Sequence, residues 1–330
     1  MLIGLAIPPH RDYHGGIDRE QNLIDIWKQR LDNLVPLDTY WIQHQNRDAY
    51  WRLGSVCEDY SKIVCPVFLI GGFADLYTDP VFRLMNQLKC PKRAIVGPWG
   101  HQWPYVHLFI LLKKMKKLIL FRDDAYPGPQ IGYLEELVHW LDHHVKGIDN
   151  GYDKKEIFSI YQLNPNVNEL HSIIKQRDGQ WIHLNSVDFN EKNKMIYYLS
   201  LDSLQIDEPQ QHSIAQLSFL SPQETGTSSG SLLHWGSDLN PDCPLDQRDD
   251  DRRSLVFDSL PLTNKIELFG FPIVKLNLSA NSEYGLICVR LCMIDENTSS
   301  SILLARGFLN LTHYKSHEHP EKLKPNEIYQ

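Results

Sequence analysis

The chain has 330 residues, of which 42% are hydrophobic and 22% are charged, and its formal net charge is −8. This composition is typical of folded globular proteins, and the length fits two domains. Because the balance is acidic and the lysines and arginines are scattered, nucleic acid is excluded as an expected partner.

Residues 1–60 are expected to be mainly helical. A stripe of apolar residues at helical spacing runs from Leu23 to Leu34 and stops before Pro36. A second, shorter helix is predicted at 37–44.

Residues 63–104 carry the strongest pattern in the chain. The apolar run 67–70 stops at a Gly-Gly pair, as a buried parallel strand does, and a second such run at 94–96 stops at Gly97. A helix is predicted between them at 80–88, with Thr78 or Asp79 as its cap.

An acid and a histidine follow these two strands. Asp75 lies on the loop after the first strand, and His101 lies on the loop after the second. The carboxyl edge of a sheet is where open α/β folds place their sites, so we expect the two side chains to meet there. Taken singly, an Asp after a Gly-Gly turn is often only a turn former, and a His beside Trp is often only packed.

Residues 105–123 place a basic block between two apolar runs. Each run is far too short to span a membrane. A membrane-surface helix is one interpretation. We favour an insertion foreign to the fold, such as translated intron sequence, because the stretch conflicts with its surroundings.

Residues 131–147 predict a helix with an apolar face and Gly147 as its cap. His139 and His143 lie four residues apart on it, a spacing compatible with a metal, but no carboxylate third ligand is evident. A solvated or packed helix is the better interpretation.

From residue 155 the pattern changes to short alternating runs between turn residues, which is typical of an all-β sandwich. The expected strands are 157–161, 194–199, 254–258, 266–268, 274–278, 285–291 and 302–309. A dense charge run at 246–253 interrupts them. By itself this run would be a solvated loop.

The six cysteines show no CxxC pair, and no cluster of Cys and His has zinc spacing. We therefore expect no metal and no cofactor. The cysteines are Cys57, Cys65, Cys90, Cys243, Cys288 and Cys292.

The segments GGFADLY and KRAIVGPWGH resemble the X-Pro dipeptidyl-peptidase and cocaine-esterase family of serine hydrolases. The similarity extends to DAYWRLGSV, WLDHHVKGID and DQRDDDRRSLVFDS. It implies an α/β-hydrolase fold, in which the triad runs Ser, acid, His along the chain. On this resemblance Asp75 is the triad acid and His101 is the general base.

The resemblance also implies a domain plan. Residues 1–60 would be a remnant of a helical lid, and 61–150 the C-terminal part of the α/β-hydrolase domain. Residues 151–330 would be a jelly-roll domain, truncated at its end, with the run 246–253 packed near the catalytic face. Arg47, Asp48, Trp51 and Arg52 would tie lid to sheet by packing and salt bridges, rather than contact substrate.

The nucleophile is missing from this pattern. Only Ser55 and Ser61 precede Asp75, and neither lies on a strand-to-helix elbow. The one G-x-S-x-G, at 226–230 with Ser228, follows the histidine in a polar, flexible context and is judged a decoy. We therefore expect a fragment that lacks its N-terminal half, with Met1 as an internal or mispredicted start.

Two functions stay open at this point. The first is hydrolysis of a peptide, ester or amide through a serine acyl-enzyme, with a small molecule or peptide as substrate. The second is an inactive fragment, a pseudoenzyme or a β-sandwich binding module. We expect no membrane span, and the sequence leaves the oligomeric state and the compartment open.

Overall fold

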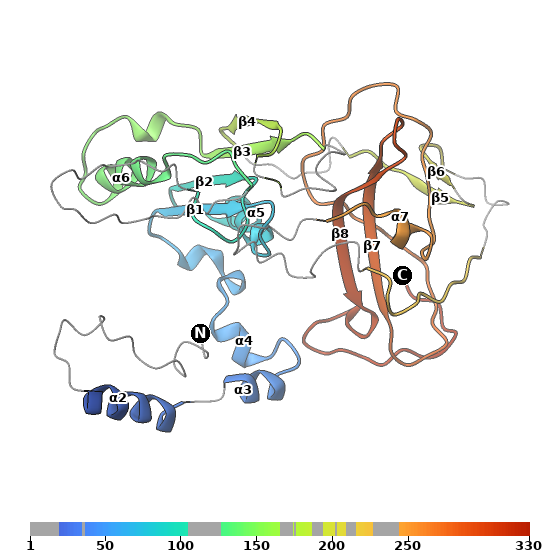
Figure 1. The fold of residues 1–330 in the computed structure, drawn as a ribbon, viewed down its shortest axis with the longest axis horizontal. Coiled ribbons are helices and arrows are strands. Elements are labelled where there is room, and N and C mark those ends of the chain that lie inside the picture. The colour runs from blue at the N-terminus through green and yellow to red at the C-terminus, as the bar shows by residue number, and fades with distance from the viewer. Residues whose placement is uncertain are drawn as a thin grey trace. The chain divides into compact units, whose positions relative to one another are not determined.

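The computed structural model describes residues 20–34, 37–104, 127–165, 174, 176–186, 194–201, 203–208, 216–226 and 244–330 (Figure 1). The chain divides into two compact units. The first comprises Met1–Glu58, Asn277–Ile287 and Leu309–Gln330, and the second Asp59–Leu276 and Cys288–Phe308. The predicted insertion at 105–123 and Ser228 lie outside the described residues.

The second unit contains a four-stranded sheet with the order β1-β2-β3-β4. β1 is parallel to β2, β2 is parallel to β3, and β3 is antiparallel to β4. No strand among the described residues pairs with the other edge of β1. The strands are β1 Val67–Gly72, β2 Lys92–Gly97, β3 Phe158–Leu163 and β4 Gly179–Leu184. The strands predicted at 67–70 and 94–96 are therefore confirmed.

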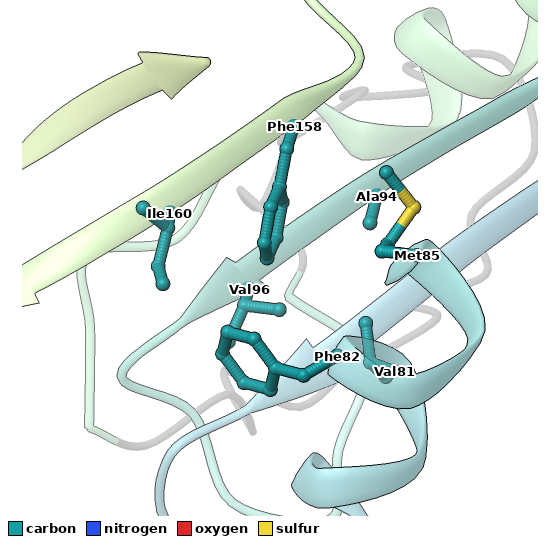
Figure 2. Close-up of a cluster of buried hydrophobic side chains, with 7 residues drawn as sticks. All are labelled: Val81, Phe82, Met85, Ala94, Val96, Phe158 and Ile160. Atoms are coloured by element: carbon teal, nitrogen blue, oxygen red, sulfur yellow. The ribbon is translucent and has the colours of Figure 1, made fainter. Parts of the chain in front are cut away.

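Helix α5, Thr78–Gln87, covers one face of this sheet and confirms the predicted helix. Its buried side chains meet those of β2 and β3 in the hydrophobic core shown in Figure 2. The predicted cap is wrong: the helix begins after Tyr77 without a side-chain cap. The Thr78 hydroxyl donates instead to the Asp75 carbonyl, at 2.9 Å, and so closes the preceding loop. The core residues are Val81, Phe82, Met85, Ala94, Val96, Phe158 and Ile160.

Helix α6, Tyr133–His144, confirms the helix predicted within 131–147, and its aromatic residues are the ones that are buried. Tyr133 and Trp140 are buried, and the Trp140 ring meets Phe68 of β1 edge-on at 5.7 Å. The aliphatic side chains of the predicted apolar face, including Leu134 and Val138, stay about half exposed. Packing of aromatic rings on the sheet has thus decided the orientation of the helix.

The first unit begins with helices α2 Glu20–Asp32, α3 Leu37–Gln43 and α4 Ala49–Leu53, which confirm the expected helical character of this region. Arg47 pairs with Glu58, and Arg52 pairs with Glu318. Both arginines thus form salt bridges, as expected. Glu58 follows shortly after Arg47 in the chain and Glu318 lies in the C-terminal segment, so these two salt bridges do not reach the sheet. A small core of Leu311, Leu323 and Tyr329 supports that segment.

The C-terminal part of the chain is rich in β-structure but less regular than expected. It contains two two-stranded sheets, β5-β6 and β7-β8. The strands predicted at 254–258, 266–268 and 274–278 are wrong, because pairing there is limited to isolated bridges such as Ser203 with Asp258 and Leu278 with Tyr329. The strands are β5 Tyr198–Ser200, β6 Ser203–Gln205, β7 Leu286–Ile294 and β8 Ser301–Asn310.

The strand predicted at 157–161 exists as β3, but it joins the parallel sheet beside β2 instead of a sandwich. The short helices are η2 Val56–Glu58, η3 Tyr60–Lys62, η4 Tyr152–Lys154, α7 Arg248–Asp251 and η9 Leu311–His313. No helix in the described ranges is both long and apolar enough to cross a membrane. The domain bounds given above stay a prediction.

Candidate active site

The two loops that carry Asp75 and His101 start at the same level of the sheet. In the parallel register of β1 and β2, Gly72 lies opposite Gly97, and both strands end there. The chain then turns away in both places, so the two loops lie side by side at the carboxyl edge. This is the edge at which the sequence placed the site.

Backbone hydrogen bonds join the two loops. The Phe73 N–H donates to the Gly97 carbonyl at 2.8 Å, and the Ala74 N–H donates to the Trp99 carbonyl at 3.0 Å. This approach requires glycine at position 72, because a Cβ there would lie 2.1 Å from the Trp99 oxygen. The acid loop and the histidine loop are therefore fixed to each other before any side chain takes part.

Trp99 anchors the histidine loop. Its side chain is buried, and its indole N–H donates to the Pro129 carbonyl at 2.7 Å. The ring occupies the space beside Gly97, where a Cβ would approach it to 2.5 Å. A bulky buried ring and a glycine thus fit together, which gives the Gly-Pro-Trp-Gly-His turn its shape.

The side chains of Asp75 and His101 meet as predicted. His101 Nδ1 lies 3.1 Å from Asp75 Oδ2. Because an ionised carboxylate only accepts hydrogen bonds, Nδ1 is the donor in this contact, and the neutral imidazole then has its acceptor at Nε2. The side chain of Asp75 is 14% exposed and that of His101 is 41% exposed. An acid on the inside and an imidazole that reaches solvent can pass protons to a reacting group.

The two site loops carry aromatic side chains that the sequence patterns do not mark as functional. The Tyr77 ring lies against His101, with centroids 5.6 Å apart. Trp103 stacks on Tyr133 at 5.6 Å. Both Tyr77 and Trp103 are more than half exposed. Their one sequence signal is an aromatic residue placed two positions after each candidate catalytic residue.

The serines that precede Asp75 are engaged elsewhere. The Ser55 hydroxyl lies 2.9 Å from the Cys57 sulfur, and the Ser61 hydroxyl donates to Asp59. Both surroundings are short helical turns, not a strand-to-helix elbow. Among the described residues, neither serine bonds to His101.

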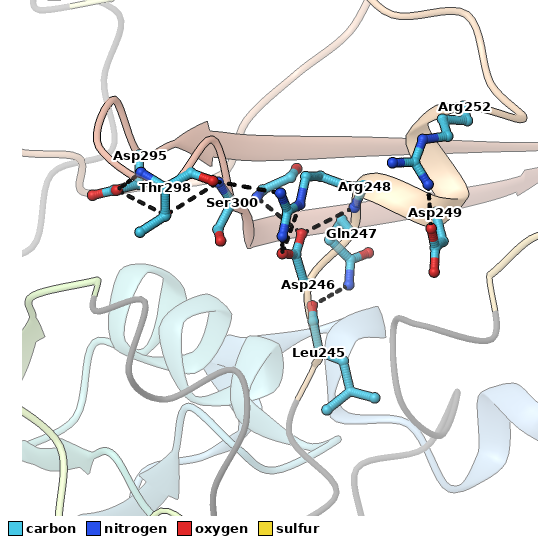
Figure 3. A network of polar contacts seen from close by, with 10 residues as sticks. Leu245, Asp246, Gln247, Arg248, Asp249, Arg252, Asp295, Thr298 and Ser300 are labelled. Carbon is cyan, nitrogen blue, oxygen red and sulfur yellow. Dashed lines mark hydrogen bonds and ion pairs between the residues drawn. The ribbon is translucent and has the colours of Figure 1, made fainter.

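The charge run at 246–253 is partly buried, which corrects its interpretation as a solvated loop. Gln247 and Asp250 are buried, and Asp250 accepts a hydrogen bond from the Gly226 N–H at 2.8 Å. Asp246 pairs with Arg248 and also accepts from the Ser301 N–H, as Figure 3 shows for the first of these contacts. These contacts connect loop to strand.

The pKa of Asp246 follows from these contacts. Partial burial pushes the pKa up, but hydrogen bonds from Arg248 and from the Ser301 N–H outweigh burial and lower the pKa to about 2. The carboxylate therefore keeps its charge at neutral pH and serves the fold.

The site and its surroundings also bear on the question of a bound metal. Within the described ranges, no three side chains of His, Cys, Asp or Glu are grouped so that they could hold a metal ion. His139, on the α6 helix with His143, contributes its carbonyl to a hydrogen bond from Asn150.

Two family models match this chain. Residues 6–103 match the family model described as X-Pro dipeptidyl-peptidase (S15 family). Residues 165–330 match the model described as X-Pro dipeptidyl-peptidase C-terminal non-catalytic domain. The first match contains both Asp75 and His101.

Curated relatives and solved structures are also similar to this chain. The Mycobacterium bovis protein named "Putative serine esterase Mb1866c" is 24% identical over 79% of this chain and 37% of its own length. A selenomethionine-labelled alpha-amino acid ester hydrolase superposes with a TM-score of 0.62 at 15% identity, over 92% of this chain and 51% of its own. An aminopeptidase from a marine sediment Thaumarchaeota archaeon superposes with a TM-score of 0.56 at 15% identity, over 92% of this chain and 50% of its own.

The chain thus spans about a third of the curated relative and about half of each solved structure. The structural likenesses, at this level of identity, bear on the fold alone. The C-terminal domain model, in contrast, covers half of the chain, and the S15 model covers most of the part before residue 104. The chain belongs to the X-Pro dipeptidyl-peptidase family.

Proposed function

We propose that Asp75 and His101 are the acid and the general base of a serine hydrolase that cleaves peptide, ester or amide bonds through an acyl-enzyme. The observation that carries this proposal is the 3.1 Å contact between His101 Nδ1 and Asp75 Oδ2, at the ends of two neighbouring parallel strands. The acid precedes the histidine along the chain, which is the order in α/β-hydrolases.

The chemistry follows from the tautomer. Asp75 holds the proton on Nδ1, so Nε2 accepts the proton of the serine hydroxyl as its oxygen attacks the substrate carbonyl. The imidazolium, stabilised by the carboxylate, then gives that proton to the leaving group. Water then removes the acyl group by the same steps. His101 takes a proton from the water molecule, the resulting hydroxide adds to the acyl carbonyl, and the proton is passed to the serine oxygen as that oxygen leaves.

The serine is proposed to lie on a segment outside this chain. Support comes from Ser55 and Ser61, whose hydroxyls are bonded within their own short turns. The fold proposed for the whole is an α/β-hydrolase with helical lid, of which this chain supplies the C-terminal part, followed by a jelly roll formed around the β-rich part described here.

The substrate class is proposed from the relatives' names, which mention an esterase, an amino acid ester hydrolase and an aminopeptidase. All these names refer to an acyl group bonded to oxygen or nitrogen, in a small molecule or a peptide. The choice between ester and amide belongs to the lid and to the half that carries the serine.

A second candidate is an inactive fragment or a binding module. The observation that favours it is the lack of an elbow serine before Asp75 in the sequence. The sequence encoded upstream of Met1 separates the two candidates. An in-frame strand, GxSxG and helix there supports the hydrolase, and a stop codon directly upstream supports the inactive fragment.

The experiment is labelling with a fluorophosphonate probe, which requires an activated serine. The 330-residue chain should not be labelled, and a longer polypeptide with the upstream elbow should be labelled in a manner that His101→Gln abolishes. Stoichiometric, His101-dependent labelling of the 330-residue chain would place the nucleophile within it and overturn the proposal on the serine. Labelling of the longer polypeptide that survives His101→Gln would overturn the role of His101.

A further inference from the structure

We propose that Tyr77 is a positioning residue for His101, which fixes the Asp75 carboxylate through its backbone and restrains the imidazole through its ring. This inference rests on the proposed function, because it concerns the same acid–histidine pair. Neither the family models nor the relatives' names assign a role to this side chain.

The backbone of Tyr77 holds the acid. Its N–H donates to Asp75 Oδ1 at 3.0 Å, while Oδ2 of the same carboxylate meets His101 Nδ1 at 3.1 Å. One oxygen is thus held by the main chain and the other by the imidazole. A carboxylate held at both oxygens has a fixed plane, so the direction in which Oδ2 accepts a hydrogen bond is fixed too.

The ring of Tyr77 holds the base. Its centroid lies 5.6 Å from that of the His101 ring, and the two planes are inclined by 56°. The imidazole is 41% exposed, so the packing around it is incomplete, and Tyr77 supplies a wall on one side. The tilted contact of the two rings thus limits the orientations open to the imidazole.

The main chain around Tyr77 is itself rigid. Thr78 begins α5 directly after it, and the Thr78 hydroxyl donates to the carbonyls of Gly72 and Asp75. The ring therefore projects from a fixed point although it is 53% exposed. An exposed aromatic ring on a rigid turn beside a reactive group is better explained by a role there than by core packing.

The test uses NMR on the purified 330-residue chain, which needs no nucleophile. The low-field resonance of the His101 Nδ1 proton is assigned by its loss in His101→Gln, and Asp75→Asn shows the pair without the carboxylate charge. Tyr77→Ala should make this proton exchange with water roughly three- to tenfold faster, the size expected for loss of one aromatic contact. Tyr77→Phe keeps the ring and the backbone N–H and should exchange at the wild-type rate.

Leu76→Ala is the matched control, because it truncates the neighbouring side chain in the same loop and leaves both aromatic rings. The indole N–H of Trp99, bonded to Pro129, reports in every variant whether the loops remain folded. If Tyr77→Ala disturbs that indole signal, Tyr77→Leu replaces it as the test, since leucine fills space without an aromatic face. Unchanged exchange in a folded Tyr77→Ala or Tyr77→Leu variant, or equal acceleration in Leu76→Ala, would overturn the inference.

These outcomes are separable from those for the proposed function. If Tyr77→Ala speeds exchange but His101→Gln leaves fluorophosphonate labelling of the longer polypeptide intact, the positioning is real and the hydrolase assignment fails. If labelling depends on His101 but the His101 Nδ1 proton exchanges at the same rate in Tyr77→Ala as in the wild type, the hydrolase assignment holds and the inference on Tyr77 fails.

Discussion

Two aspartates in this molecule sit in nearly the same turn and serve different ends. Asp75 accepts a hydrogen bond from the Tyr77 N–H at 3.0 Å, and Asp246 accepts one from the Arg248 N–H at 3.1 Å. In each case one carboxylate oxygen is fixed by the backbone two residues later. The second oxygen differs: it meets His101 in one turn and the Arg248 side chain in the other.

The difference teaches that the partner, not the turn, decides what a fixed carboxylate does. A guanidinium stays charged at every physiological pH, so Asp246 is held in a permanent ion pair that also binds the Ser301 N–H of β8. An imidazole can both accept and release a proton during a reaction. The Asp75 turn can therefore take part in proton transfer, while the Asp246 turn links a loop to a strand.

The largest expected effect comes from replacing the carboxylate in each of the two turns and comparing the rates of hydrolysis. In a polypeptide that carries the serine, Asp75→Asn should reduce ester hydrolysis on the order of 10³–10⁴-fold, because the amide no longer holds His101 in the required tautomer. Asp246→Asn, the matched change in the other turn, should leave the rate within about threefold, since a structural pair acts only through stability. Hydrolysis of a p-nitrophenyl ester measures both. Equal losses in the two variants would contradict the separation of roles.

The next effect concerns the approach of the two site loops. Gly72→Ala would put a Cβ 2.1 Å from the Trp99 carbonyl oxygen, a backbone atom that cannot move aside cheaply. We expect the free energy of unfolding to fall by about 3 kcal/mol, the upper end for an overpacked site. Gly307→Ala, with nothing within 4 Å of its Cβ, is the control and should be nearly neutral. Urea denaturation compares them, and a stable Gly72→Ala variant would show that the loops are not held as described.

A smaller effect is expected on the free energy of unfolding at low pH. The pKa of Asp246 lies at about 2 in the folded chain, below its ordinary value of 3.8. A lowered pKa gives stability that is fully present above the ordinary value and is lost as the pH falls towards the folded value. The shift corresponds to roughly 1–2 kcal/mol after allowance for solvent screening. Urea midpoints of wild type and Asp246→Asn should therefore converge between about pH 5 and pH 2. A difference that is constant over this range would rule out the ion pair as its cause.

The smallest effect lies three residues after Asp246, within helix α7. Asp249 pairs with Arg252 at 2.6 Å, but both side chains are 73% exposed (Figure 3). We expect Asp249→Ala to change the free energy of unfolding by less than about 0.5 kcal/mol, because water screens exposed pairs. The measurement is again the urea midpoint at neutral pH. A loss as large as that of Asp246→Asn would mean that the charge run acts as one network.

The candidate site could be predicted from the sequence because its signals are local. A glycine ends each buried strand, and Asp75 and His101 follow at fixed spacing, so the topology brings them to one edge. The role of Tyr77 could not be predicted, because its main-chain N–H has no side-chain signature. The same holds for the Trp99 carbonyl, which joins the loops through an atom that every residue possesses.

Away from the site, hydrophobic periodicity predicted where helices and strands occur better than it predicted what they pack against or pair with. The helical pattern at 131–147 was correct, but Leu134 and Val138 stay half exposed because the rings of Tyr133 and Trp140 pack instead. Alternation at 254–258 indicated a strand, yet a strand also needs a neighbour, and Asp258 finds only a single bridge to Ser203. The periodicity of apolar residues predicts which face of a helix or strand is apolar, but it does not predict which other element will pack on that face.

The hydrogen bonds described above that join the Asp75 loop to the His101 loop lie between residues 67 and 104, and the Trp99 indole adds one to Pro129. The contact between Asp75 and His101 is therefore supported by main-chain atoms of the two loops that carry them, and no serine takes part in these hydrogen bonds. Such a pair can persist in a chain whatever becomes of the nucleophile. A well-formed acid–histidine pair in a distant relative would then record ancestry, and a test for activity has to look for the third residue.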